Sequence, residues 1–268
     1  MEAFELIGFF GAFIVGLILG LIGSGGSILS VPTLVYLFGI NPVTATAYSL
    51  FIVGTTSLIG SIKNLKNNLI NYSTTLLFSF SAVITVYITR KYLIQLIPET
   101  IINSDFIFIS KNQLIMLLFS ILMLVAGFLM IKKTPKTIVG LKQTKTIAPN
   151  KFLIFTEGSL MGFLTGLVGA GGGFIIIPIL VILSNLRMKA AIATSLAIIS
   201  LKSLIGFIGD IQNLKIDWIF LLSFTLISVI GIFVGQLFSN KVPENNLKTV
   251  FGLFVIVIGL SVLYIEFI

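Results

Sequence analysis

The chain alternates long apolar stretches with short polar ones over almost its whole length. Each half contains five apolar stretches: residues 6–22, 27–38, 43–62, 71–97 and 113–131, then 152–168, 173–184, 190–208, 218–239 and 247–265. A helix needs about 20 apolar residues to cross the hydrocarbon core of a bilayer. Most of the stretches approach this length, so the pattern predicts a bundle of membrane-spanning helices.

Composition supports the same class of protein. Of the 268 residues, 57% are apolar and only 10% are charged, whereas an ordinary soluble domain has about 25% charged residues. The chain has no cysteine and no histidine, which removes disulfides, thiolate metal sites and the commonest general base. We therefore expect no metal, no cofactor and no enzymatic activity. The net charge of +8 fits membrane topology better than nucleic-acid binding, because of where the lysines lie.

The two halves of the chain are copies of each other. GLIGSGGSILSVP, at residues 20–32, recurs 146 positions later as GLVGAGGGFIIIP, at residues 166–178. The match continues without a gap to residues 65 and 211, and 19 of the 46 aligned positions are identical. Such self-similarity indicates internal duplication.

The second apolar stretch of each half is too short to cross a bilayer alone. Each contains a proline, Pro32 or Pro178, and each follows a glycine cluster that interrupts a helix. The first and second stretches of each half are therefore expected to form a broken or re-entrant pair. The predicted fold is an all-α polytopic bundle of two repeats, residues 1–131 and 152–268, joined by a linker, residues 132–151, with six lysines.

The placement of charge predicts the orientation. Positive residues in short loops stay cytoplasmic, so the basic linker is placed inside. The outer segments then contain mainly acids: Glu2, Glu5, Glu99, Asp105, Asp210, Asp217 and Glu266, against Lys111 and Lys215. An odd number of crossings in each half gives an inverted repeat, whereas four crossings would give parallel repeats. Arg90 and Lys91 fall near the outer end of a long helix, where either they snorkel to the surface or one crossing has been miscounted.

The glycine clusters are the main candidate for a binding site. Irregular backbone survives inside a bilayer only where protein or a wet cavity covers it, and the amides at the start of the next helix attract anions. The candidate ligands are the amides of Ser24, Gly25, Gly26 and Ser27 in the first repeat, and of Ala170, Gly171, Gly172 and Gly173 in the second. The alternative is close helix packing through small residues. No nucleotide-binding motif fits, because neither cluster has the lysine or acid that such motifs require.

Three side chains after the breaks are further candidates. Ser49 and Ser195 are equivalent by repeat, and their hydroxyls are expected either to bind a ligand or to form ordinary interhelical hydrogen bonds, worth about 0.6 kcal/mol on average. Lys202 lies inside an apolar stretch, where its repeat equivalent is the neutral Thr56. A charge in such a place costs about 2.5–3.5 kcal/mol on insertion scales, which favours a functional role such as anion binding. The alternatives are that Lys202 snorkels outward or pairs with Glu157.

The twin pattern resembles the TauE/SafE family of sulfite-exporter-like membrane permeases. The resemblance rests on GLIGSGGSILSVP with TATAYSL, and on GLVGAGGGFIIIP with AAIATSL. It implies a multi-pass transporter of the inner membrane that carries a small sulfur-containing or organic anion. Two features depart from the twin pattern: Ser27 stands where the second repeat has Gly173, and Lys202 is charged.

The sequence therefore predicts a secondary transporter of a small anion, held between the two glycine breaks and moved by alternating access. An anion channel and a non-transporting membrane scaffold are the alternatives. The expected partners are the anion and the lipid bilayer, with coupling protons as an option and no nucleic acid. The substrate, the direction of transport and the oligomeric state, including a homodimer, stay open.

Overall fold

A computed structural model of the chain describes residues 2–23, 26–103, 108–131, 151–182, 186, 188–239 and 244–267, and almost all of them are helical. The first repeat consists of α1 (Glu2–Ile22), α2 (Ser27–Pro32), the π-helical η1 (Thr33–Leu37), α3 (Pro42–Lys66), α4 (Tyr72–Ile88), the π-helical η2 (Thr89–Leu93), α5 (Ile94–Leu96) and α6 (Lys111–Ile131). The second consists of α7 (Lys151–Val168), α8 (Gly173–Ile182), α9 (Met188–Ile211), α10 (Trp218–Phe238) and α11 (Glu244–Phe267). The all-α prediction is confirmed. Five of the described helical segments are long and apolar enough to cross a membrane.

A short hairpin of strands was not expected from the sequence. β1 (Thr100–Asn103) and β2 (Phe108–Ser110) pair antiparallel between α5 and α6, with Thr100 opposite Ser110. This segment falls between two apolar stretches, so hydrophobic periodicity gave no signal for it. The predicted linker lies outside the described residues apart from Lys151, which begins α7.

The first glycine break turns the chain back on itself. Gly23 has a φ of +80°, which L side chains rarely adopt. Beyond the break, Gly26 lies against Val15 of α1, and farther along the returning chain Thr33 lies against Gly11. The segment formed by α2 and η1 therefore runs back along α1, and the pair forms a helical hairpin.

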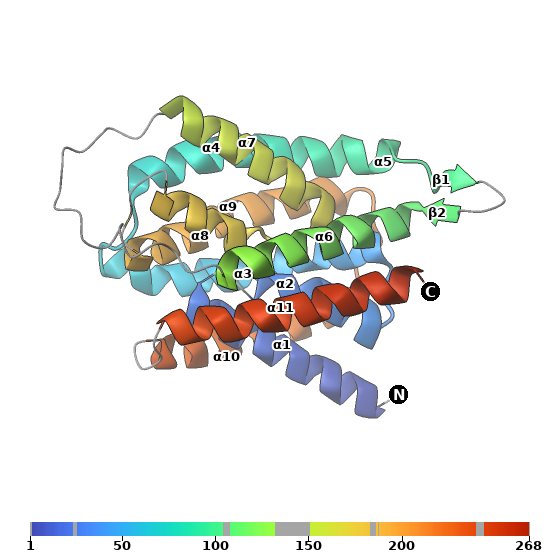
Figure 1. The fold of residues 1–268 in the computed structure, drawn as a ribbon, viewed down its shortest axis with the longest axis horizontal. Helices are drawn as coiled ribbons and strands as arrows, with labels where there is room; N and C mark the ends of the chain where they lie inside the picture. The colour runs from blue at the N-terminus through green and yellow to red at the C-terminus, as the bar shows by residue number, and fades with distance from the viewer. Residues whose placement is uncertain are drawn as a thin grey trace.

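Two outer pairs of helices each combine one helix from the first repeat with one from the second. α1 packs along α10, and its repeat equivalent α7 packs along α4, so that the two pairs flank the central α3 and α9 (Figure 1). Both contacts depend on small residues. Gly16 lies against the backbone of Ser228, and the repeat-equivalent contact joins Gly162 to the backbone of Ala82. α6 and α11 lie side by side at the front of the view.

The central helices α3 and α9 run in opposite directions. The amide of Asn71, just after α3, donates to Thr194 Oγ1 near the start of α9 at 3.1 Å. The amide of Asp217, after α9, donates to the hydroxyl of Tyr48 near the start of α3 at 2.6 Å. The two bonds are equivalent under the 146-residue offset. Since α3 and α9 are copies of one helix, their antiparallel packing supports the predicted inverted repeat.

Candidate functional site

The two glycine breaks meet in the interior, at the crossing of α3 and α9. A Cβ atom built on Gly171 would lie 3.1 Å from the Cβ of Ser27, which begins α2. A Cβ atom on Gly169 would lie closer still to Thr46 of α3, against its carbonyl oxygen. Gly169 and Gly171 have φ values of +69° and +59°. These positions therefore need glycine both for the backbone conformation and for the close approach of the other repeat.

Ser49 and Ser195 connect each break to the opposite repeat. Ser49 Oγ donates to the carbonyl oxygen of Gly169 at 2.8 Å, and Ser195 Oγ lies 3.4 Å from the carbonyl oxygen of Gly23. The two contacts are again equivalent by repeat. Ser30, which the sequence analysis did not single out, hydrogen-bonds to the hydroxyl of Ser49. In this conformation both serines bind irregular backbone, so they hold the two breaks together.

Lys202 reaches the second break from α9. Its side chain is completely buried, and Nζ donates to Thr165 Oγ1 at 2.8 Å. A Cβ atom on Gly172 would lie 3.1 Å from the same Nζ. Lys202 therefore does not snorkel, and it forms no salt bridge with Glu157 or any other described acid. The ammonium group has three N–H donors, and Thr165 accepts from one of them.

The candidate residues that the structure describes are all shielded from solvent by protein. Ser24 and Gly25 lie outside the described residues. The other candidates are all buried: Gly26, Ser27, Ser49, Ala170, Gly171, Gly172, Gly173, Ser195 and Lys202. The amide of Gly172 already donates to the carbonyl oxygen of Ala170, so it is occupied in this conformation.

A set of buried hydroxyls on α3 and α9 was missed by the sequence analysis. Thr56, Ser57 and Ser203 are completely buried, and their hydroxyl oxygens have no hydrogen-bond partner among the described residues. Thr56 is the repeat equivalent of Lys202, and Ser57 is the repeat equivalent of Ser203. Buried polar groups are nearly always hydrogen-bonded, so these hydroxyls leave polar capacity unused in the middle of α3 and α9. Their shared position in the two repeats is the signal that points to them.

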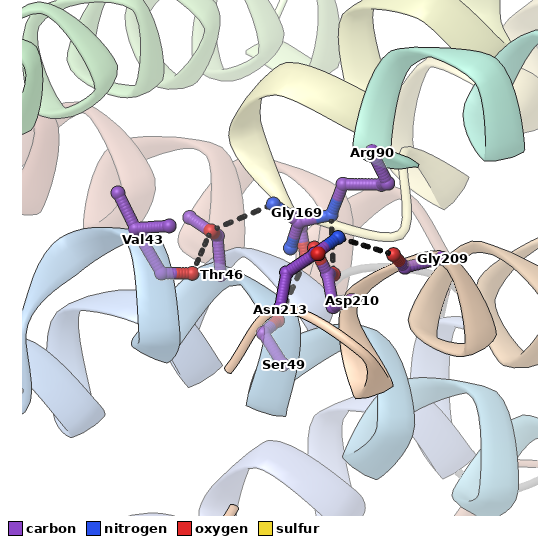
Figure 2. Close-up of polar contacts among 8 residues, drawn as sticks. All are labelled: Val43, Thr46, Ser49, Arg90, Gly169, Gly209, Asp210 and Asn213. Carbon is purple, nitrogen blue, oxygen red and sulfur yellow. Dashed lines mark hydrogen bonds and ion pairs between the residues drawn. The ribbon is translucent and has the colours of Figure 1, made fainter. Parts of the chain in front are cut away.

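A second buried cation, Arg90, lies beside Gly169 of the second break (Figure 2). Arg90, in η2, is completely buried; its Nε lies 2.9 Å from Asp210 Oδ2 at the end of α9, and its Nη1 donates to Thr46 Oγ1 at 3.1 Å. The expectation that Arg90 snorkels to the surface is wrong, because Asp210 neutralises it inside the protein. Lys91 is partly exposed and donates to the hydroxyl of Tyr87 at 3.1 Å.

The repeat also carries a signal for this ion pair. The equivalents of Arg90 and Asp210 are Gln236 and Asn64, which carry no charge. Gln236 Nε2 donates to the carbonyl oxygen of Gly60 at 2.8 Å. Both charges of the pair are thus absent together from the other copy. A joint departure of two positions from the repeat indicates that they act together.

Comparison with known proteins identifies a family that the chain matches. The family model described as "Sulfite exporter TauE/SafE" matches residues 8–262. A probable membrane transporter protein of Xylella fastidiosa (strain 9a5c) is 26% identical over 94% of this chain and 92% of its own length. The probable membrane transporter protein YunE of Bacillus subtilis is 25% identical over 94% and 96%, and one from Methanocaldococcus jannaschii is 27% identical over 90% of each chain. No solved structure matches significantly.

Proposed function

Because the chain belongs to the TauE/SafE family, we propose that it is a secondary transporter that moves a small anion, such as sulfite or an organosulfur anion, across the inner membrane. The anion binds between the two glycine breaks. Lys202 supplies the positive charge, and the backbone of residues 170–173 and 24–27 supplies donors once the breaks separate. Ser49 and Ser195 line the same space.

The burial of Lys202 without an acidic partner among the described residues is the observation that carries this proposal. Buried charges in proteins are normally paired or hydrogen-bonded on all sides, because removing an ion from water costs several kcal/mol. Lys202 has one neutral partner, Thr165, and ionisable groups inside a membrane mark substrate or ion pathways. An anion beside Gly172 would complete the missing interactions.

The packing of helices from one repeat against helices of the other supports alternating access. The breaks are held together by the contacts of Ser49 with Gly169 and of Ser195 with Gly23, each of which joins one repeat to the other. The described residues of the site are all buried, so access from either side requires one set of inter-repeat contacts to open. Inverted repeats give two such openings, one on each face of the membrane.

The test is exchange transport in proteoliposomes. Vesicles that contain the purified protein and unlabelled sulfite are diluted into labelled sulfite, and the transient accumulation of label is followed over time. Lys202→Thr, which introduces the residue of the other repeat, is compared with Lys189→Thr, a change of an exposed lysine on the same helix.

A transporter gives saturable counterflow. Lys202→Thr should reduce it by about tenfold or more, because removing the ion-pair partner of a buried anion costs at least ~1.4 kcal/mol. Lys189→Thr should leave it unchanged. Flux that never saturates and shows no stimulation by internal anion would indicate a channel. Absence of flux for sulfite, sulfonates and small carboxylates would reject the proposal.

A further inference from the structure

The buried charges of the described residues leave one positive charge in the interior. The buried charged side chains are Arg90, Lys111, Lys202 and Asp210. Arg90 Nε lies 2.9 Å from Asp210 Oδ2. Lys111, the first residue of α6, has its Nζ 3.9 Å from Oε1 of the exposed Glu99. Lys202 is the one without an acidic partner in the described part of the chain. The ion pair of Arg90 is therefore neutral, and the candidate site holds a single uncompensated cation.

The half of the site that belongs to the first repeat has a neutral group instead. Thr56 occupies the position equivalent to Lys202, is completely buried, and has a hydroxyl with no partner among the described residues. It lies one helical turn after Val53, whose side chain lies against Gly171 of the second break. Residues three apart on a helix share a face, so Thr56 belongs to the face of α3 that looks toward the breaks. The site thus offers one charge from α9 and a hydroxyl from α3.

We propose that this charge balance makes the site selective for monovalent anions over divalent anions of the same shape. A monovalent anion neutralises Lys202, so the closed site carries no net charge. A divalent anion leaves one negative charge in the membrane interior, and an uncompensated buried charge costs several kcal/mol. The inference rests on the proposed function, because it concerns the same site. It goes beyond it by naming the charge of the substrate.

The experiment compares methanesulfonate with sulfate by calorimetric titration of the purified wild-type protein. Both anions are tetrahedral at sulfur and present sulfonyl-type oxygens, but the first carries one charge and the second carries two. We expect methanesulfonate to bind about tenfold or more tightly than sulfate, in keeping with the cost of one buried charge.

A second comparison adds a charge to the site. Thr56→Lys gives both repeats a lysine at the equivalent position, and Thr56→Met adds a side chain of similar length without charge. We expect Thr56→Lys to raise the affinity for sulfate relative to methanesulfonate by about tenfold, and Thr56→Met to leave the ratio as in the wild type.

The outcomes separate this inference from the proposed function. If wild-type protein binds sulfate as tightly as methanesulfonate, or more tightly, the charge argument is overturned while anion binding stands. If it binds neither of these anions, nor sulfite or small carboxylates, the proposed function itself fails and the inference falls with it. If Thr56→Lys does not fold, the wild-type comparison still decides. A preference for methanesulfonate that Thr56→Met abolishes as strongly as Thr56→Lys would mean that shape, and not charge, sets the ratio, which would also overturn the inference.

Discussion

The buried ion pair between Arg90 and Asp210 gives the sharpest prediction about stability. Asp210→Asn keeps the shape of the side chain and removes its charge, which leaves the guanidinium of Arg90 buried with no acid. Arg90→Gln together with Asp210→Asn removes both charges. The double change introduces the residues that the other copy already has, Gln236 and Asn64, so the fold already accommodates both neutral residues at the equivalent positions.

The expected magnitudes differ strongly between the two variants. Breaking a buried pair from one side costs about 3–5 kcal/mol, whereas replacing both partners by neutral groups is often close to neutral. For a protein of this length 1 kcal/mol corresponds to about 2–4 °C in Tm, so Asp210→Asn should lower Tm by about 6–20 °C. The double variant should recover most of that loss, because Thr46 Oγ1 offers a neutral partner at position 90.

Trp218 provides the assay. It is the one tryptophan of the chain, it begins α10, and its ring contacts Phe51 and Phe207 at centroid distances of 6.1 Å. Its fluorescence therefore follows the packing of α3 against α9 during thermal unfolding in detergent. If Asp210→Asn and the double variant lose the same stability, the cost does not come from an uncompensated charge. A Tm unchanged by Asp210→Asn would mean that the pair is not buried.

Two further predictions concern the breaks. Gly169→Ala places a Cβ against the backbone of Thr46 at a positive φ. It should abolish folding or lower the free energy of unfolding by several kcal/mol. Gly39→Ala, also at a positive φ but with open space around it, should lower it by only about 1–2 kcal/mol. Thermal unfolding of both variants measures the difference, and equal losses would argue against close contact at Gly169. Ser49→Ala leaves the carbonyl oxygen of Gly169 without its donor and should lower the free energy of unfolding by about 1–3 kcal/mol. The control, Ser261→Ala at an exposed position, should change Tm by less than about 2 °C. A Tm unchanged by Ser49→Ala would contradict the inter-repeat hydrogen bond.

The sequence was sufficient for the helices and for the position of the breaks. Apolar length marks a membrane segment because the bilayer has a fixed thickness, and duplication made each glycine cluster visible twice. Lys202 was also identifiable, because a single charged residue within an apolar segment is visible in the sequence without knowledge of its neighbours in the fold. These features are local in the sequence or repeat at a fixed offset.

The ion pair was missed because pairing is a property of the folded chain. Arg90 and Asp210 are far apart in the sequence, and each lies near the end of an apolar stretch, where a charge is ordinarily solvated. For the same reason, the sequence does not distinguish ligand binding from helix contact for Ser49 and Ser195. Their acceptors, the carbonyl oxygens of Gly169 and Gly23, belong to the opposite repeat and become neighbours only when the copies pack antiparallel.

Three of the buried charges occupy positions at which the two copies differ. The repeat equivalents of these three charges are neutral: Thr56 for Lys202, Gln236 for Arg90 and Asn64 for Asp210. The shared backbone pattern supplies two equivalent sets of contacts, one for each end of the molecule. The charges make those ends unequal, because one end is joined by an ion pair and the other by the neutral bond from Gln236 to Gly60. Under alternating access, the two openings of the proposed transporter would therefore break different interactions, an ion pair at one end and a neutral hydrogen bond at the other.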